Sequence, residues 1–410
     1  MEEVTAGPPP HLLWINHFAV APSDGGGTRH FELARELICR NWRVTIAASD
    51  FHLHTRGYTR RPSAAARAAI SEQIDGVDFL WLWAAPYERN DWHRARNWLS
   101  FQRSLAHWRP NGSSPDVIIG SSPHLFAALA GYRMARRLGV PFLFEVRDLW
   151  PESLLAAGGS KGPPYYMLGA IARYLYRRAD RVIVLARGVA QYLEHHGVAG
   201  DKLVYIPNGA NTDTFVPRTR SRGPFTLIYA GAHGPANGLD TVLDAAELLA
   251  DQPFRVILVG DGPSKDELRA KAHRRELTKV EFLDPVPKAE MPALLARADA
   301  GLMVLRSAPL FSYGVSPNKL FDYLAAGLPV ACNVPGEVAM LLHQSGAVEQ
   351  ARDSSAPALA DAIMRIAMRS PRERECMGAS GREWVAREHS RSVLGERLDR
   401  TLRGVMQQRS

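Results

Sequence analysis

The residue types best suited to chemistry occur together in the last third of the chain, between Ser316 and Asp322. Pro317 suits the first position of a helix that Ser316 would cap. Lys319 then lies in the first turn, where the helix dipole disfavours a cation unless an anion is bound there. Asp322 follows on the same helix face. The pattern predicts that Lys319 binds a diphosphate and Asp322 binds ribose hydroxyls. The alternative is an i,i+3 ion pair between the two.

Three glycine-rich turns each follow a predicted strand, where glycines let backbone N–H groups approach a ligand closely. They comprise Gly25, Gly26, Gly27 and Thr28, followed by Arg29 and His30; Gly231, Ala232, His233, Gly234 and Asn237; and Gly260, Asp261 and Gly262. The first turn is neither a dinucleotide-binding fingerprint nor a Walker A loop, and we expect it to contact a phosphate or an acceptor. Each could instead be a plain tight turn, but two such turns in one domain favour a shared ligand.

Charged residues also crowd the end of the apolar segment 141–148, where Glu145, Arg147 and Asp148 occur. Catalytic groups project from strand ends in parallel α/β sheets, which favours a catalytic role. The alternative is a surface turn with an Arg–Asp ion pair. His124, a weaker candidate, follows another predicted strand.

These residues must be positioned by alternating strands and helices, which the apolar pattern predicts throughout the chain. The predicted strands are 11–20, 42–49, 116–122, 141–148, 181–186 and 203–209 in the first half, and 226–234, 255–262, 280–285 and 300–305 in the second. Such alternation indicates an α/β fold with two doubly wound parallel sheets. Ligands bind at the carboxyl ends of such strands, so we expect a central cleft between two domains.

The first domain is predicted to span residues 1–215 and the second 216–384, with a polar linker at 216–224. Segment 53–110 is rich in Trp and Arg, and we interpret it as loops and helices over the first domain's face. A charged helical segment ends the chain, and its part 385–407 could pack back onto the first domain.

Composition excludes several classes of protein. Hydrophobic residues make up 46% of the 410 residues, which excludes a mainly disordered chain, and three cysteines exclude a disulfide scaffold. Residues 1–220 hold 26 Lys and Arg against 19 Asp and Glu, an excess that suits an anionic membrane, nucleic acid or phosphorylated ligands, or simply a basic surface. Because no nucleic-acid-binding module is evident, we expect no nucleic acid partner.

The sequence contains no apolar run of about 18 residues and no signal peptide, so a cytoplasmic location is expected. Segment 165–181 combines an apolar face with four arginines. This pattern is typical of a helix at a membrane interface, although an ordinary packing helix would look the same. Peripheral contact with the inner face of the plasma membrane is therefore a further expectation.

The motifs resemble those of family 4 of the retaining nucleotide-sugar glycosyltransferases, whose GT-B fold has two Rossmann-like domains. The resemblance covers nearly the whole chain, through GGGTRHFELARELICRNWRVTIAAS, DVIIGSSPH, FEVRDLWPES, VIVLARGV, YIPNGANTDTF, YAGAHG with NGLD, LVGDGP and SPNKLFDYLAAGLPV. EVRDLWP and GVSPNKLFDYLAAG look most like the WbuB-like branch, the amino-sugar transferases of O-antigen and capsule assembly. The resemblance implies sugar transfer from a UDP-sugar to a lipid-linked or saccharide acceptor, without metal or cofactor.

The resemblance also implies roles for residues by position. The implied donor-binding residues are Gly26, Gly27, Gly231, His233, Gly234, Asn237, Gly260, Asp261, Gly262, Val286, Ser316, Pro317, Asn318, Lys319 and Asp322. The uracil would lie near Gly260 and Val286, the diphosphate at Ser316 to Lys319, and the ribose at Asp322. The implied acceptor-binding residues are Thr28, Arg29 and His30, and the implied catalytic residues are Arg147, Asp148, Glu145, His124 and Lys319.

The sequence departs from the family pattern at three places. Gly314 stands where the family has the first acid of a two-acid motif, and Ser121 where it has a common His. The usual Arg and Lys pair falls near Ala232, His233 and Asn237, so Lys319 and Arg306 would supply the positive charge. Two alternatives therefore remain open: a UDP-sugar 2-epimerase of the same fold, and a catalytically inactive subunit that binds nucleotide.

Overall fold

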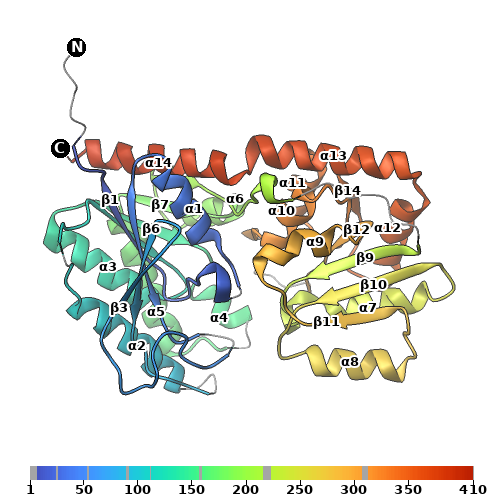
Figure 1. Cartoon of the computed structure of the whole chain (residues 1–410), viewed down its shortest axis with the longest axis horizontal. Coiled ribbons are helices and arrows are strands. Elements are labelled where there is room, and N and C mark those ends of the chain that lie inside the picture. Colours follow the sequence, from blue (N-terminus) through green and yellow to red (C-terminus); the bar gives the residue numbers. More distant parts are fainter. Residues whose placement is uncertain are drawn as a thin grey trace, which may run out of the picture.

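The computed structural model describes residues 7–24, 26–52, 55–88, 92–110, 112–156, 159–215, 223–306 and 313–409. It contains two α/β domains side by side, with a long helical segment running along both (Figure 1). The predicted α/β architecture with two doubly wound, mainly parallel sheets is confirmed. Gly25 and residues 216–222 of the predicted linker lie outside the described residues.

The sheet of the first domain has eight strands in the order β3-β4-β2-β1-β5-β6-β7-β8, and all are parallel except β3. Its strands are β1 (His11–Ile15), β2 (Arg43–Ser49), β3 (Ile70–Ile74), β4 (Val77–Leu82), β5 (Val117–Ser121), β6 (Phe142–Val146), β7 (Arg181–Val184) and β8 (Leu203–Tyr205). Strands β3 and β4 correct our interpretation of segment 53–110 as loops and helices. The apolar run of β4, which includes Trp81, pairs with β2 and is buried.

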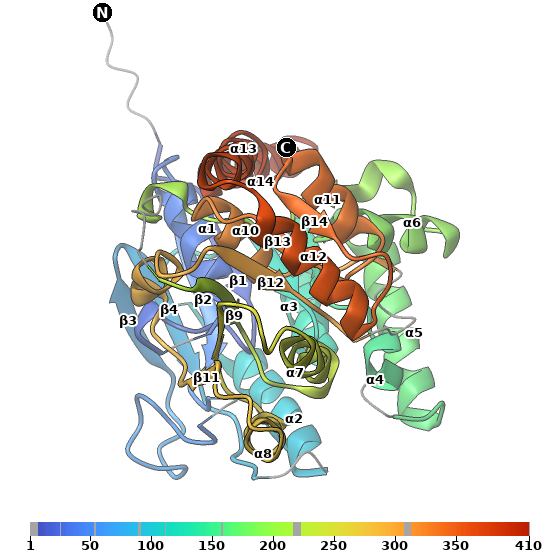
Figure 2. The same cartoon turned by 90° about the vertical axis from the view of Figure 1, so that its right-hand side faces the viewer.

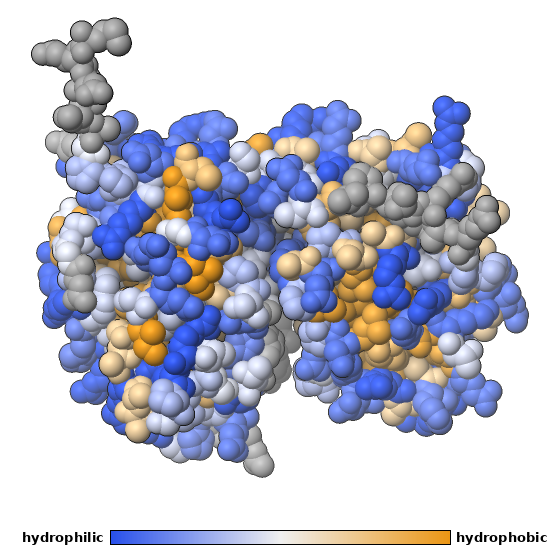
Figure 3. All heavy atoms as spheres, in the orientation of Figure 1, coloured by the Kyte–Doolittle hydropathy of each residue, from blue (hydrophilic) through white to orange (hydrophobic). Residues whose placement is uncertain are grey.

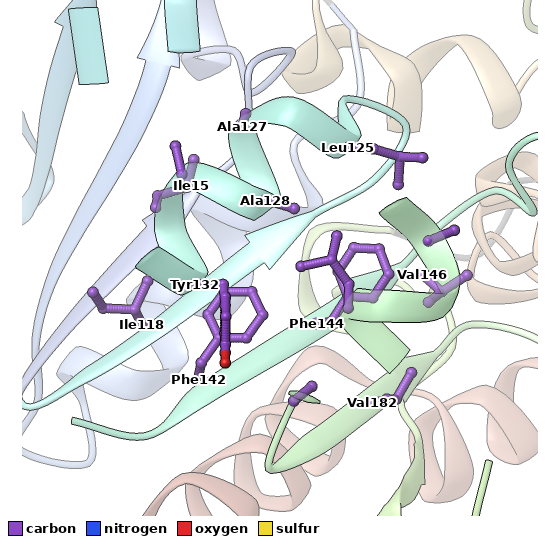
Figure 4. Packing of buried hydrophobic residues seen from close by; sticks show 14 of the residues in the cluster. Ile15, Ile118, Leu125, Ala127, Ala128, Tyr132, Phe142, Phe144, Val146 and Val182 are labelled. Atoms are coloured by element: carbon purple, nitrogen blue, oxygen red, sulfur yellow. The ribbon is translucent and has the colours of Figure 1, made fainter. Parts of the chain in front are cut away.

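Helices cover both faces of this sheet. One face carries α1 (Arg29–Ile38), and the other carries α2 (Trp92–His107), α3 (Leu125–Leu138), α5 (Pro163–Arg178) and α6 (Arg187–His195), with the short α4 (Glu152–Ala156) beside them. Figure 4 shows Tyr132 of α3 packed against Phe142 of β6, with Ile15 and Ile118 to the left of this ring pair. Apolar burial on this scale fixes the strand ends that carry the candidate site.

The sheet of the second domain has six parallel strands in the order β11-β10-β9-β12-β13-β14. They are β9 (Phe225–Ala230), β10 (Phe254–Val259), β11 (Val280–Leu283), β12 (Ala300–Met303), β13 (Val330–Cys332) and β14 (Val348–Gln350). Helices α9 (Met291–Leu295), α10 (Asn318–Ala325), α11 (Glu337–Ser345) and α13 (Pro371–Glu388) pack on one side, and α7 (Leu239–Leu248), α8 (Lys265–Arg274) and α12 (Ala356–Met368) pack on the other (Figure 2).

The C-terminal helices connect the two domains. Trp384 and Val385 of α13 belong to the core of the second domain. The next helix, α14 (Arg391–Gln407), packs on α1, and its Leu394 and Leu398 enter the core of the first domain. The chain therefore returns to the first domain after completing the second, which ties the two domains together away from the cleft.

Candidate active site

The loops at the carboxyl ends of the two sheets meet across the domain interface. The backbone N–H of Asn208, after β8, donates to the Ser316 hydroxyl at 2.9 Å, and its side-chain amide donates to the Ser316 carbonyl. A Cβ atom on Gly27, after β1, would lie 3.6 Å from Nδ2 of Asn318. On the face drawn in Figure 3, a notch lies between the two domains. The first glycine-rich turn therefore lies close to the start of α10, in keeping with the family resemblance, which implies that both contact the donor.

The predicted cap of α10 is wrong. The helix begins at Asn318 with Pro317 as its N-cap residue, and no side chain caps it. The Ser316 hydroxyl instead accepts the hydrogen bond from Asn208 in the other domain. The first backbone N–H groups of α10 are thus left without a side-chain acceptor, which favours an anion at this helix end.

Lys319 occupies the centre of the second domain's strand edge. Its Nζ donates to Oη of Tyr229 at 2.7 Å and to Oδ1 of Asn237 at 3.4 Å, and it lies 3.9 Å above the Tyr229 ring. Both partners, Tyr229 and Asn237, are neutral, and no carboxylate among the described residues forms an ion pair with Lys319. Burial lowers the pKa of Lys319 to about 7. A cation held only by dipoles and an aromatic ring is suited to receive an anionic ligand.

The two glycine-rich turns of this domain pack against each other. Gly260 has φ +144°, and a Cβ atom there would lie 1.9 Å from the Gly231 carbonyl oxygen, so only glycine fits. The backbone N–H of His233 donates to the Asp261 carbonyl at 2.8 Å. The His233 ring is fully buried, and neither ring nitrogen has a partner in the described part of the chain. Burial lowers its pKa, so the ring is neutral at pH 7.

Asp322, the residue predicted to bind ribose, lies on the next turn of α10. Both of its carboxylate oxygens accept hydrogen bonds of 2.7 Å from Nζ of Lys288. The predicted alternative, an ion pair between Lys319 and Asp322, is therefore absent. Lys288 lies in the short helical turn before α9, and its side chain is 28% exposed, so water or a ligand can reach this pair.

The carboxylate of Glu337 lies in the space that a side chain at Gly314 would need. Gly314 has φ +85°, and a Cβ atom there would lie 2.3 Å from Oε2 of Glu337. Glu337 accepts hydrogen bonds from the backbone N–H groups of Arg187 at 2.7 Å and Gly188 at 3.1 Å. It therefore caps the N-terminus of α6 in the first domain. A side chain at position 314 would displace this contact between the domains.

The first domain's strand edge contains a buried ion-pair network. Nε of Arg29 donates to Oε1 of Glu145 at 3.1 Å, and the guanidinium also donates to the backbone carbonyls of Ile206 and Pro207. Arg29 is 1% exposed and Glu145 is 0% exposed. Burial lowers the pKa of Arg29 to about 10, so the guanidinium stays charged at pH 7. Arg29 and Glu145 therefore neutralise each other within the protein.

His30 and Ser121 complete this network. His30 Nε2 lies 2.9 Å from Oε2 of Glu145, and the Ser121 hydroxyl donates to the same oxygen at 2.6 Å. Burial would raise the pKa of Glu145, but His30 and Arg29 outweigh it and hold that pKa below its usual range. Thr28, also buried, donates to Glu32 at 2.6 Å. Arg29, His30 and Glu145 thus lie at the predicted edge but face each other, which corrects our expectation that they meet a substrate directly.

His124 forms a second buried contact, with His17 after β1. The two Nδ1 atoms lie 3.2 Å apart, and Trp98 and Phe101 of α2 pack on the His124 ring. Burial lowers the pKa of both rings, to about 3 for His17. Nε2 of His124 has no partner in the described chain. His124 therefore serves as a packed, neutral ring beneath the cleft rather than as an exposed base.

Arg147 and Asp148 are the catalytic candidates that remain accessible. The Ser122 hydroxyl accepts from the backbone N–H of Arg147 at 2.8 Å and of Asp148 at 3.1 Å, which fixes the turn after β6. Asp148 is exposed, and Nε of the half-buried Arg147 has no partner among the described residues. The two side chains form no ion pair with each other there, so the predicted alternative for this turn is not observed.

Five residues of the site were not predicted from the sequence: Tyr229, Lys288, Glu337, His17 and Asn208. Tyr229 lies one residue before the end of β9, a position in which a buried aromatic normally indicates only packing. Lys288 and Glu337 act through partners far away in the sequence, and no local pattern marks such pairs. The described residues contain no group of three His, Cys, Asp or Glu that could hold a metal ion; metal independence stays a prediction.

Comparisons with known proteins agree with this geometry. Residues 24–209 match the family model of the glycosyl transferase 4-like domain, and residues 224–368 match that of the glycosyl transferases group 1. WcaI of Escherichia coli K12, named for colanic acid biosynthesis, is 28% identical over 229 residues, which are 52% of this chain and 56% of WcaI. A GDP-mannose-dependent phosphatidylinositol monomannoside mannosyltransferase of Mycobacterium tuberculosis is 30% identical over 221 residues, 49% of this chain and 56% of that enzyme. The matches thus span little more than half of each relative.

Solved structures share the whole fold. Sucrose-phosphate synthase of Thermosynechococcus elongatus superposes with a TM-score of 0.75 at 17% identity, covering 97% of this chain and 100% of that one. HepE of Anabaena in complex with UDP-glucose gives a TM-score of 0.69 at 14% identity, covering 96% and 99%. At these identities the likeness establishes the fold, which is GT-B as predicted.

Proposed function

The chain belongs to the GT-B glycosyltransferases, with a glycosyl transferase 4-like domain followed by a group 1 domain, and on this premise we propose that it transfers a sugar from a UDP-sugar to a hydroxyl of a lipid-linked or saccharide acceptor. The proposed setting is cell-surface polysaccharide assembly, for which WcaI is named. The observation that carries the proposal is Lys319, a half-buried ammonium with neutral partners at the start of α10.

The donor is proposed to bind the second domain. The diphosphate would lie between Lys319 and the free N–H groups of α10, where Gly27 of the first domain approaches. The turn at Gly260, which packs on the buried His233, and the backbone near Val286 would meet the nucleoside. Ribose hydroxyls could donate to Asp322, whose oxygens Lys288 already orders.

The chemical step is proposed to depend on stabilising the leaving diphosphate. Charge develops on the β-phosphate as the bond to the sugar breaks, and Lys319 with the α10 N–H groups would neutralise it. In a front-face route that retains the anomeric configuration, a β-phosphate oxygen would help to deprotonate the acceptor hydroxyl. Asp148 and Arg147 would orient the sugar and acceptor, and no metal or cofactor takes part in this route.

The buried network of the first domain is proposed to position the acceptor side of the cleft. Arg29 holds the carbonyls of Ile206 and Pro207, just before the Asn208 contact with Ser316. Glu145 in turn holds Arg29 and His30. These residues are therefore assigned a positioning role, and Thr28 with Gly27 remains the proposed edge of the acceptor site.

The identity of the donor's nucleobase and sugar is the part of the proposal that needs a direct test. HepE was crystallised with UDP-glucose, whereas the mycobacterial relative is named as GDP-mannose-dependent. We propose UDP, and an N-acetylated amino sugar, because segments 145–151 and 314–327 resemble those of amino-sugar transferases. None of the described helices is long and apolar enough to cross a membrane. The proposed location of the enzyme is the inner face of the plasma membrane.

Calorimetric melting of the protein with UDP, GDP and ADP tests the donor assignment. A ligand at about 100 times its dissociation constant stabilises the folded state by ~2.7 kcal/mol. We expect UDP to raise the melting temperature more than GDP or ADP does. An equal or smaller shift with UDP would remove the uridine assignment while leaving the fold and the site intact.

A catalytically inactive nucleotide-binding subunit is the second candidate, because Gly314 lacks an acid and Glu337 is committed to capping α6. Release of UDP from UDP-sugars by the purified protein, lost in Lys319→Ala, would exclude it. Binding of UDP with no turnover in the presence of any lipid-linked acceptor would favour it.

A further inference from the structure

Three helices on one face of the first domain have an unusual charge composition. Helices α2, α3 and α5 each contain three arginines, and none of them contains an aspartate or glutamate. Helices α2 and α5 both pack on α3, so the three form one continuous layer, which we call the cationic layer. Nine cations without an acid among them create a positive potential over this face.

Helices α7 and α8 of the second domain differ from this layer in their charges. Helix α7 contains three acids and no Lys or Arg, and Lys271 of the neighbouring α8 pairs with Asp240 and Asp244 of α7. In the cationic layer, by contrast, Arg96, Arg133 and Arg177 are exposed and form no ion pair with any described residue. The charge is therefore available to a partner rather than neutralised locally.

The cationic layer also concentrates exposed apolar side chains. Five of the nine large hydrophobic residues that are exposed in the described chain lie on α2 and α5: Trp92, Leu99, Tyr166, Met167 and Tyr174. Trp92 is 65% exposed and Tyr166 is 61% exposed. Aromatic side chains beside arginines are typical of surfaces that enter the headgroup region of a bilayer.

A hollow opens at the edge of the cationic layer, between α2 and the end of β4. It has a volume of about 460 Å³, and its lining includes Trp83, Trp108, Arg67 and Arg103 but no acidic residue. The Arg67 guanidinium lies 4.6 Å above the Trp83 ring. A hollow lined by two arginines and two indoles would suit a phosphate with its attached polar group.

We propose that the cationic layer docks on a bilayer of anionic lipid, with its arginines at the lipid phosphates and its aromatic side chains in the headgroup region. The proposal deepens the proposed function, because a lipid-linked acceptor would be presented in such a membrane. Lipid is favoured over nucleic acid because the exposed side chains are large, apolar and arranged on a helical layer.

Sedimentation with large unilamellar vesicles tests this directly, with no donor or acceptor present. We expect the protein to bind phosphatidylcholine vesicles containing about one third phosphatidylglycerol at low salt, and not pure phosphatidylcholine. Replacing one arginine on each helix, as Arg96→Glu, Arg133→Glu and Arg177→Glu together, should weaken partition by roughly 100-fold or more. Replacing Tyr166 and Met167 by Ser should also weaken it, and this loss should persist in high salt.

The matched control reverses three exposed arginines of the second domain, as Arg269→Glu, Arg274→Glu and Arg372→Glu, for the same change of net charge. Equal loss of binding in this control, or no binding of wild type to anionic vesicles, would overturn the proposal. So would preferential binding of single-stranded RNA through the same arginines. The melting shift with UDP should be unchanged in the cationic-layer variants, because they lie away from the donor site. Loss of vesicle binding with an intact UDP shift thus separates this proposal from the proposed function.

Discussion

The two strand edges that face each other across the cleft differ in whether their charged groups have partners of opposite charge. In the first domain, Arg29 and Glu145 are completely buried and satisfy each other and nearby polar groups. In the second domain, Lys319 meets only a phenol, an aromatic ring and an amide. A charge with all partners in place supports the fold, whereas a charge with none of opposite sign is prepared for a ligand. We therefore assign a structural role to the charged groups at the first domain's strand edge and a ligand-binding role to Lys319 at the second domain's edge.

The largest effect that sharpens this comparison is expected from Glu145→Gln. The variant leaves the Arg29 guanidinium buried without a counter-ion, which should lower the free energy of unfolding by about 3–5 kcal/mol. Urea unfolding measures this loss. Glu396→Gln, which breaks an exposed pair with Arg400, is the control and should cost less than about 1 kcal/mol. Unchanged stability combined with lost turnover would place Glu145 in the chemistry and break the comparison.

The next effect is expected from Lys319→Ala, which should reduce turnover by about 10²–10³-fold because the leaving diphosphate loses its ammonium. Stability should stay the same or rise, since an unpaired cation leaves a partly buried position. Initial rates of UDP release and thermal unfolding measure the two properties. Lys271→Ala is the control in the same domain, because its ammonium is already paired with carboxylates. Full turnover in Lys319→Ala would sink the assignment of this edge.

Much of the fold could be predicted from the sequence, because buried parallel strands appear as apolar runs. The exceptions have physical reasons. Strand β3 lies at the sheet edge and is half exposed, and β13 and β14 are three residues long. Such strands depend on their neighbours in the sheet rather than on their own pattern.

The site was predictable in its position but not in its partners. Lys319 and Asp322 lie where the local motif indicates, at the start of α10. Ser316 does not cap the helix, because a residue from the other domain uses its hydroxyl. Arg29 and Glu145 are 116 residues apart, and only the folded sheet shows that they neutralise each other. The sequence therefore shows which charged residues are present, but it does not show which of them are neutralised by partners in the folded protein.

The pH dependence of donor binding should sharpen the contrast further. Burial lowers the pKa of Lys319 to about 7 in the free protein, so the ammonium loses its proton as the pH rises through 7. A bound diphosphate favours the charged form, so UDP affinity should fall between pH 7 and 9 by up to about tenfold per pH unit. Titration calorimetry in buffers of different ionisation enthalpy would detect the accompanying proton uptake. Lys319→Arg should remove the slope because its guanidinium stays charged. A flat profile in the wild-type protein would show that Lys319 does not meet the anion.

The smallest effect is expected from Lys288→Ala, which tests an ion pair that lies between the two extremes. Lys288 and Asp322 neutralise each other, as the charges of the first domain's network do, but solvent reaches them as it reaches Lys319. Ribose hydroxyls can donate to the oxygens that lose the ammonium, and an ion pair that water can reach contributes little. UDP affinity should therefore change by less than about threefold. Lys265→Ala, which breaks the pair with Asp284, is the control. Titration with UDP and 2′-deoxy-UDP should show that the preference for the ribose hydroxyl persists in Lys288→Ala. A loss of affinity as large as that in Lys319→Ala would instead mean that Lys288 itself binds the nucleotide, and the chemical edge of the second domain would then extend from α10 to the turn before α9.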